Sequence, residues 1–460
     1  MRKATSLFLT ITMLIAVLPA CGVSKPDINV WQEVPSVPQT NERLSVFCVG
    51  DLRDSGMIQL ALNLYQKMYP DIQVELIKPE FESGDYNQRD ELYQQVAAQI
   101  MAGAGPDVFL VDDAVMDVEK LVRQGVFADM EPFFQADNFD WTPYHQAVMD
   151  GGVWNGKRFV VPLSYNFPLL FTTRSALKET GFDVDACGDY MGFLEETTRF
   201  MDDTAQTRQL FCKPLLIVDV AGTAGISVAN YDTQSIDLSS PVLESGFLWY
   251  KTVMERHPGN EMTLGYDGLE YSAGAVRDGQ ILWAQNLNGA FKGFFYEFAA
   301  LKTIDEVVML PIRDANGGIQ AQIEYSVAVR GNSENLQNAY NYIKLLLCPE
   351  IQNKLQNGDQ LSVLNSANEY GYEMISEGKL WQIKAGTAGF VGTVDPNQAT
   401  DWPNREEFDQ FVALTEEITG ASFSNRLRLQ GKMYPYVYEN ADYEETLKTA
   451  QREMEIYISE

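Results

Sequence analysis

The chain has 460 residues, and its 64 acidic side chains against 34 lysines and arginines give a formal net charge of −30 at pH 7. So acidic a surface argues against nucleic acid and anionic lipid as partners, because both carry the same sign of charge. The apolar fraction of 45% is that of an ordinary globular protein, which excludes a chain that is disordered throughout. The length allows two or three domains with cores of their own.

Residues 1–20 have the pattern of a signal peptide. Two basic residues precede an apolar run from Leu7 to Leu18, which is too short to cross a bilayer as a helix. The run leads into a Leu-Pro-Ala-Cys sequence that ends at Cys21 and resembles the lipobox of bacterial lipoproteins. This resemblance implies cleavage before Cys21 and attachment of lipid, including palmitate, to its sulfur; an ordinary secretory signal is the alternative. The polar, Pro-rich residues 21–43 predict a flexible tether.

Strand and helix patterns alternate after the tether. Apolar runs of strand length occur at 44–49, 72–77 and 107–111. A helical stripe begins after Ser55 and stops at Pro70, and a second stripe lies between the last two strands. This order predicts an α/β fold with mainly parallel sheets covered by helices.

The ends of the predicted strands mark the first candidate ligand residues. Ligands of parallel sheets bind beyond the carboxyl ends of the strands. Asp51 follows the first strand, and Asp112 and Asp113 follow the third. Helix caps or solvated loops are the alternative explanation for these carboxylates.

Short motifs recur in a fixed order along most of the chain. They are YPDIQVE at 69–75, AQIMAGAGPDV at 98–108, GVFADMEP at 125–132, GKRFVVP at 156–162, RDGQILW at 277–283, VMLP at 308–311, and helical segments at 339–352 and 442–458. Each motif alone is weak evidence. Their common order resembles that of family 1 bacterial extracellular solute-binding proteins, the maltose-binding type.

The resemblance implies a type II periplasmic-binding-protein-like fold, in which two α/β lobes enclose a cleft. The chain would cross between the lobes near Tyr165, Met309 and Leu364. It would divide into lobe 1, residues 44–165 and 310–364, and lobe 2, residues 166–309 and 365–460. Such crossings act as hinges, so that ligand selects a closed state, and the closed protein would dock on the permease subunits of an ABC importer at the outer face of the cell membrane.

A carbohydrate is the first choice of ligand, because sugars stack on aromatic rings and hydrogen-bond to polar side chains at their edges. The candidate contacts lie in loops, at strand ends and at crossings, some of them placed there by the resemblance. They are Trp141, Tyr144, Tyr165, Phe167, Asn286, Asn288, Tyr325 and Trp402. Trp249 and Trp381 are predicted to be structural, whereas Trp283 could face either the cleft or the core.

Other functions remain as alternatives. The solute could be a polyamine or a phosphorylated polyol, or the chain could be a carbohydrate-binding adhesin or sensor. An enzyme is not expected, because no pair of carboxylates stands out and no nucleophile or nucleotide motif is present. His145 and His257 lack metal-ligand spacing and are expected at the surface. We expect no cofactor, no metal and a monomer.

Four cysteines follow Cys21, at positions 48, 187, 212 and 348. Export would allow a disulfide, and Cys187 with Cys212 is the pair closest in sequence. Buried free thiols are an equally good interpretation of the same residues.

Overall fold

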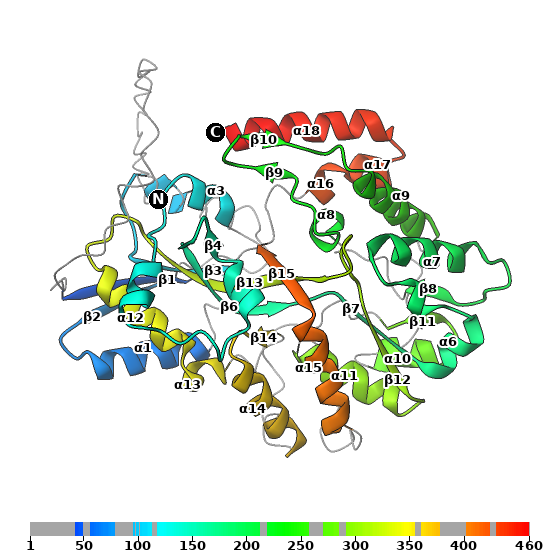
Figure 1. Ribbon diagram of the computed structural model, residues 1–460, viewed down its shortest axis with the longest axis horizontal. Helices are drawn as coiled ribbons and strands as arrows, with labels where there is room; N and C mark the ends of the chain where they lie inside the picture. Colours follow the sequence, from blue (N-terminus) through cyan, green and yellow to red (C-terminus); the bar gives the residue numbers. More distant parts are fainter. Residues whose placement is uncertain are drawn as a thin grey trace, which may run out of the picture.

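The computed structural model describes residues 42–48, 56–78, 95–96, 98–100, 102–112, 117–211, 219–256, 270–284, 291–354, 360–377, 402–423 and 429–459. Two halves lie side by side along its long axis (Figure 1). We call the half with the largest sheet the sheet half. The second half consists of the described residues within 169–311 and 429–459.

The large sheet has seven strands, six of them in the order β14-β6-β13-β3-β1-β2, with β15 also paired to β13. They are β1 (Arg43–Cys48), β2 (Gln73–Ile77), β3 (Val108–Asp112), β6 (Val160–Asn166), β13 (Ile319–Val329), β14 (Leu361–Ser362) and β15 (Ile418–Phe423). β1 pairs in parallel with β2 and β3, as the strand–helix order predicts. β13 pairs antiparallel with β3 and β6, because it enters the sheet from the second half. The α/β fold class is confirmed, with a sheet that is mixed rather than parallel throughout.

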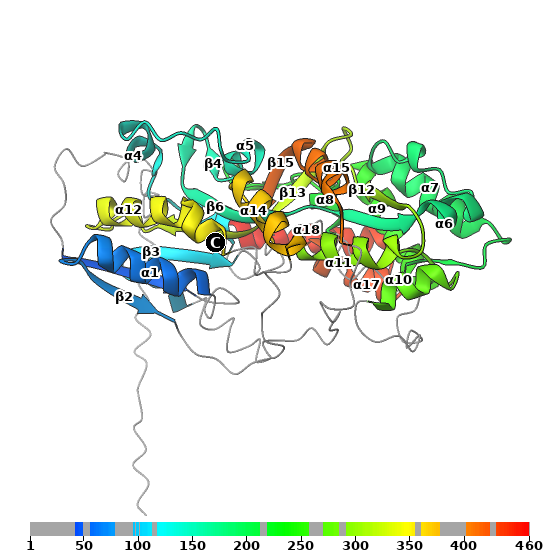
Figure 2. The same cartoon turned by 90° about the horizontal axis from the view of Figure 1, so that it is seen from below.

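Successive residues of the large sheet enter two different cores. Val46, Leu110 and Val327 pack on the face that continues into the main core of the molecule. Phe47 and Phe109 point to the other face and form a smaller core. Helices α1 (Gly56–Met68) and α12 (Leu336–Leu347) cover the first face (Figure 2). Helix α3 (Val118–Arg123) covers the second. This period of two explains why the strands read as almost continuous apolar runs: both faces are buried.

Helix α1 confirms the helix expected between Ser55 and Pro70. Its buried Met57, Ala61 and Tyr65 recur at four-residue steps and so share one side of the helix. The Tyr65 hydroxyl donates to the backbone oxygen of Asn338 in α12, at 3.1 Å. That hydrogen bond ties together the two helices that cover the main face of the sheet.

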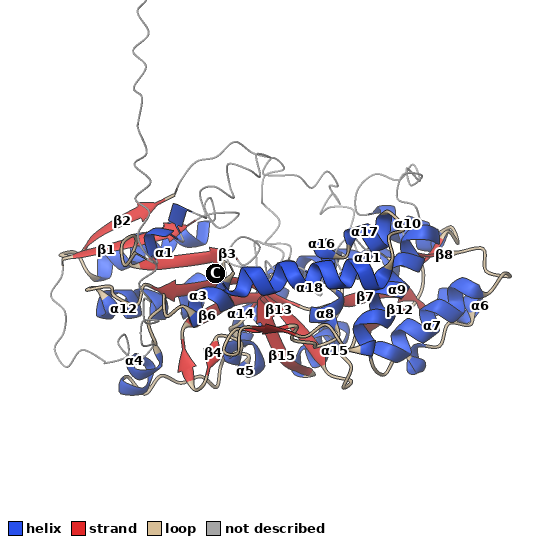
Figure 3. Ribbon diagram, turned by 90° about the horizontal axis from the view of Figure 1, so that it is seen from above, coloured by secondary structure: helices blue, strands red, loops and turns tan. Residues whose placement is uncertain are grey.

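The second half is built from short strand pairs covered by helices. Its strands are β7 (Leu169–Thr173), β8 (Gln209–Phe211), β9 (Ala229–Asn230), β10 (Ser235–Ile236), β11 (Ile281–Trp283) and β12 (Val307–Pro311). β7 pairs antiparallel with β12, and β8 pairs in parallel with β11. The helices are α6 (Arg174–Thr180), the 3₁₀ helix η3 (Val184–Ala186), α7 (Tyr190–Asp202), α8 (Val220–Thr223), α9 (Pro241–Arg256), α10 (Glu270–Arg277), α11 (Phe291–Lys302), α16 (Leu429–Lys432), α17 (Tyr434–Tyr438) and α18 (Tyr443–Ser459). Figure 3 shows α18 running along this half with its C-terminal end beside the sheet half.

The remaining elements lie around the sheet half and at its border with the second half. They are α4 (Glu131–Ala136), α5 (Gln146–Asp150), β4 (Val153–Trp154), β5 (Lys157–Arg158), α13 (Pro349–Gln352), α14 (Asn365–Ser376) and α15 (Arg405–Glu416). β15, from the stretch that the sequence analysis gave to lobe 2, pairs with β13 of the large sheet. The exact lobe boundaries stay a prediction.

Candidate functional site

Within the described residues, the chain passes between the two halves at two adjacent places. β6 belongs to the large sheet and leads directly into β7 of the second half, while β12 of the second half leads into β13 of the large sheet. β7 and β12 are paired, with Leu169 opposite Pro311. The two crossings therefore lie next to each other near the positions that the resemblance implies, and any rotation of one half against the other must bend these segments.

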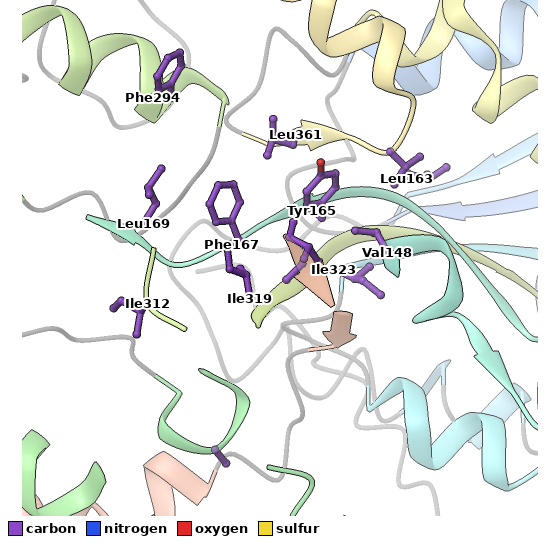
Figure 4. Packing of buried hydrophobic residues seen from close by; sticks show 14 of the residues in the cluster. Val148, Leu163, Tyr165, Phe167, Leu169, Phe294, Ile312, Ile319, Ile323 and Leu361 are labelled. Atoms are coloured by element: carbon purple, nitrogen blue, oxygen red, sulfur yellow. The ribbon is translucent and has the colours of Figure 1, made fainter. Parts of the chain in front are cut away.

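Two predicted ligand residues, Tyr165 and Phe167, are buried at the first crossing (Figure 4). The Tyr165 ring lies 5.2 Å from the His145 imidazole, and the Phe167 ring stacks on Phe411 of α15 with centroids 5.9 Å apart. Burial raises the pKa of the Tyr165 phenol, although a hydrogen bond with the Thr415 side chain acts to lower it. In this structure both rings are core residues that hold α15 against the crossing, and their contact with ligand stays a prediction.

The opposite face of the crossing strands carries a polar row. Side chains alternate along a strand, so Asn166 points away from Tyr165 and Phe167. The Asn166 amide donates a hydrogen bond to the Glu324 carboxylate of β13. Gln322 of β13 lies opposite Asn166 in the sheet register. These residues were not predicted from the sequence; the alternation of apolar and polar residues that begins at Ile319 was the signal that could have marked them.

A cavity with a volume of about 790 Å³ lies among α5, α14, α15 and β15. Its walls include the predicted ligand residue Tyr144, the amides of Asn365 and Asn368, and the carboxylates of Asp150 and Glu416. The Tyr144 hydroxyl donates to the backbone oxygen of Leu347, at 3.0 Å, and burial raises its pKa to about 12. The cavity borders Phe411, so it lies on the Tyr165 side of the crossing strands and not on the polar Glu324 side.

The surface role expected for His145 is not what the structure shows. The imidazole Nδ1 is buried without a hydrogen-bond partner among the described residues, and Nε2 lies 2.8 Å from the Thr415 backbone oxygen. Burial lowers the pKa of the imidazole below its usual range, because the charged form would lose its hydration. His145 is therefore a neutral packing residue that links the start of α5 to the end of α15. His257 lies outside the described residues.

Of the other predicted aromatic residues, Trp141 contacts the predicted ligand residue Tyr144, with ring centroids 5.9 Å apart. Trp141 packs against Phe134, with centroids 4.7 Å apart, and the Arg158 guanidinium lies 4.2 Å from its ring. Tyr325 is half-buried beside Glu324, and its hydroxyl lies 3.5 Å from the Gln360 amide. Trp402 is half-buried and contacts Phe295 edge to face. Among the tryptophans expected in helices and strands, Trp249 is buried as predicted, Trp283 faces the core, and Trp381 lies outside the described residues.

Strand ends hold the remaining candidates. Asp112 ends β3 and lies opposite Tyr325 of β13. This register brings two predicted ligand residues to one point of the large sheet. The other candidates lie outside the described residues; they are Asp51, Asp113, Asn286, Asn288 and the lipidation site Cys21.

The two halves also touch through polar contacts away from the crossings. Asp117 caps α3 of the sheet half and accepts a hydrogen bond of 2.8 Å from the Tyr231 hydroxyl of the second half. The Arg123 guanidinium pairs with Asp232 at 2.8 Å, next to Tyr231 in the chain. The Lys120 ammonium donates to the Tyr457 backbone oxygen of α18, at 2.9 Å. We call this group of contacts the α3 clasp.

The described part of the chain also bears on metal binding, disulfides and membrane spans. No group of three or more potential metal ligands occurs there. No helix in this part has the length and apolarity needed to cross a bilayer. Cys187 and Cys348 are thiols, and burial raises their pKa values to about 12 and about 11. Cys212 lies outside the described residues.

Comparison with known proteins gives a family for part of the chain. Residues 50–200 match the family model described as bacterial extracellular solute-binding protein. No curated protein sequence matches the chain. The matched family is one of binding proteins, which agrees with the sequence-based expectation that the chain is not an enzyme.

Solved structures share the fold over nearly the whole chain. The sugar-binding protein MalE of Xanthomonas citri has a TM-score of 0.61 at 12% identity, covering 91% of this chain and 97% of its own. A cyclic alpha-maltosyl-1,6-maltose binding protein of Arthrobacter globiformis has a TM-score of 0.55 at 13% identity, covering 91% and 99%. A family 1 extracellular solute-binding protein of Alicyclobacillus acidocaldarius has a TM-score of 0.54 at 13% identity, covering 92% and 100%. At these identities the likeness establishes the fold and nothing finer.

Proposed function

We propose that this chain, a bacterial extracellular solute-binding protein, captures a carbohydrate between its two halves. It then delivers the carbohydrate to the permease of an ABC importer. The observation that carries this proposal is the shared fold over about nine-tenths of the chain, including proteins whose names record maltose-type sugars. The adjacent crossings supply the hinge that such capture needs.

The solute contacts belong to the same proposal. Asp112 and Tyr325 meet in the sheet register, and Asp51, Asp113, Asn286 and Asn288 are expected at the same edge from the sequence. Tyr144 borders the cavity beside α5, whereas Trp141 and Trp402 pack against aromatic neighbours. Carboxylate and amide groups next to aromatic rings are the combination that binds sugar hydroxyls and sugar faces.

Export and anchoring are further parts of the proposal. Removal of residues 1–20 would leave a monomer attached to the outer face of the cell membrane through lipid on Cys21, with 21–43 as its tether. Labelled palmitate should enter the wild-type protein and not the Cys21→Ser variant. Incorporation that is equal in both would reject the anchor and leave the binding function standing.

A ligand panel tests the carbohydrate assignment. Thermal unfolding of the purified protein is measured with maltose, cycloalternan, acarbose and tagatose, and with spermidine and glycerol phosphate for the alternative solutes. A ligand that binds only the folded state raises the unfolding temperature. A rise with sugars supports the proposal, and a rise with spermidine or glycerol phosphate alone rejects it. A sugar response without any effect on uptake in a strain that lacks the gene would instead favour a carbohydrate-binding adhesin or sensor.

A further inference from the structure

A break in the register of the large sheet singles out one carboxylate. In the register with β6, Ile323 of β13 lies opposite Tyr165 and Tyr325 lies opposite the next residue of β6, Ser164, so the register passes over Glu324. Among the described residues, the pairing with β15 ends at Ile323 and the pairing with β3 begins at Tyr325. Glu324 is thus an inserted bulge residue at the point where the carboxyl ends of β3 and β15 meet on the same side of β13.

The structure compensates for this bulge. The Tyr325 backbone N–H donates to the Ser164 hydroxyl of β6, at 3.2 Å, which satisfies an amide next to the interrupted ladder. The register of β13 with β6 is restored by Pro162, opposite Ser326. Bulges turn a side chain away from its regular direction and are common next to binding sites. A compensated bulge beside the crossing therefore points to a requirement on the direction of the Glu324 side chain.

A neighbour holds the Glu324 carboxylate in place. Asn166, which is buried at the end of β6, donates its side-chain amide to one carboxylate oxygen. Glu324 itself is half-buried, on the face of the crossing strands opposite Tyr165. Its strand neighbour Tyr325 lies opposite Asp112. The carboxylate is thus oriented, partly open, and located where the two halves join.

We propose that Glu324 binds the solute and sets its charge specificity, accepting hydrogen bonds from the hydroxyls of a neutral sugar and disfavouring an anionic one. Asn166 acts as the residue that positions the carboxylate. This inference rests on the proposed function, because it concerns the solute of the same site. An ionised carboxylate is purely an acceptor, so it suits hydroxyl donors, and a like charge beside it in a half-buried site is repelled.

The test compares affinities for two probes in variants of the purified protein. The neutral probe is the panel sugar that the wild type binds most tightly, and the anionic probe is digalacturonate. Glu324→Gln should weaken binding of the neutral sugar about tenfold, the scale of a lost hydrogen bond to a charged group, and should bring the two affinities closer together. Glu324→Asp keeps the charge and shortens the reach, so it should weaken the neutral sugar while digalacturonate stays excluded.

A matched control separates local contact from overall charge. Glu75→Gln removes one negative charge from an exposed position on β2 of the same sheet, and it should change neither affinity. Far-ultraviolet circular dichroism and thermal unfolding confirm that each variant is folded, and Glu324→Asp carries the test if Glu324→Gln does not fold.

The outcomes for the inference and for the function are distinct. If the wild type binds the neutral sugar and Glu324→Gln leaves both affinities within twofold, the inference is overturned while the proposed function stands. If Glu75→Gln shifts the affinities as strongly as Glu324→Gln, the effect is one of net charge and the inference is also overturned. A wild type that binds none of the panel sugars overturns the proposed function, and the inference with it.

Discussion

The two halves of the molecule treat a buried carboxylate in opposite ways. In the sheet half, Asp107 accepts hydrogen bonds from the Ser45 backbone and hydroxyl, at 2.9 and 2.7 Å, and from the Ser333 hydroxyl at 2.7 Å. Desolvation acts to raise its pKa, but these hydrogen bonds prevail and hold the pKa below the usual value. In the second half, Glu297 of α11 is equally buried and one of its oxygens has no partner among the described residues. Burial alone raises its pKa to about 8.

Hydrogen-bond partners, rather than the degree of burial, therefore decide whether each of these two buried carboxyl groups is charged. Asp107 is ionised and fixes three segments of the chain, since Ser45, Asp107 and Ser333 are far apart in sequence. Glu297 is protonated at neutral pH and acts as a polar group inside an aromatic core. The first carboxylate stabilises the fold, and the second weakens it as the pH rises.

The largest effect is expected from Asp107→Ala. The substitution leaves the buried donors of Ser45 and Ser333 unpaired and removes the partner of the Arg330 guanidinium, which lies 3.5 Å away. Loss of one member of a buried charged pair costs about 3 to 5 kcal/mol, so urea unfolding should shift to clearly lower denaturant. Asp140→Ala removes an exposed carboxylate and should have little effect. Equal destabilisation by both variants would show that Asp107 has no special role.

Glu297→Gln should remove the contribution of this side chain to the pH dependence of stability. The folded-state pKa of about 8 lies above the ordinary value of 4.5, so the folded protein retains a proton that the unfolded chain releases. Stability from this group is therefore present below pH 4.5 and is lost as the pH rises towards 8 and beyond. At pH 7 the variant should be more stable than the wild type by about 3 kcal/mol, with little difference at pH 4. If the difference in unfolding free energy between the variant and the wild type were the same at the two pH values, a buried carboxyl with a raised pKa at this position would be contradicted.

Ser333→Ala should produce a smaller change with a specific pH signature. It removes one donor to Asp107 and also the hydroxyl that accepts the Asn335 backbone N–H, at 3.0 Å. We expect a loss of about 1 to 2 kcal/mol at pH 7. Because Asp107 stabilises the fold only while ionised, the loss should shrink as the pH falls below the pKa of an ordinary carboxyl, when measured by unfolding from pH 7 to pH 3. A loss of unfolding free energy that does not change with pH would show that the effect does not come from the hydrogen bond to ionised Asp107.

The smallest effect on stability is expected at the α3 clasp, where Asp117 joins the two halves. Tyr231→Phe removes the 2.8 Å hydrogen bond and keeps the ring, so unfolding should change by about 1 kcal/mol or less. Its main effect should be on ligand affinity, since the contact exists only when the halves are close together. Small-angle scattering without ligand should show a more extended molecule than the wild type. An unchanged profile would mean that other contacts determine the approach of the halves.

Much of the sheet half could be predicted from the sequence, since its strands are apolar on both faces and α1 shows a clear helical period ended by Pro70. β15 could not, because Thr419, Gly420 and Ser422 give it no apolar pattern and only pairing with β13 makes it a strand. The Glu324 bulge was equally hidden: a polar residue at that position fits a regular alternation, and the inserted residue appears only when β13 is aligned with β6.

The burial of single side chains could not be predicted from the sequence for a similar reason. Tyr165 and Phe167 were chosen for their position at a crossing, but whether a crossing residue faces the core or the opposite side depends on strand register. The same one-residue step separates the buried Tyr165 from the polar Asn166. His145 looked like an isolated surface residue, because its contact with Thr415 joins positions 270 residues apart.

The pairing of β15 with β13 has a consequence for how the protein is made. The large sheet receives strands from residue 43 to residue 423, so its last strand leaves the ribosome when nearly the whole chain has been synthesised. Pairings between such distant segments slow folding, because long loops must close before any contact forms. The nascent chain should therefore remain incompletely folded throughout translation. A secretion channel can translocate a chain in this state, and a chaperone must keep it from aggregating.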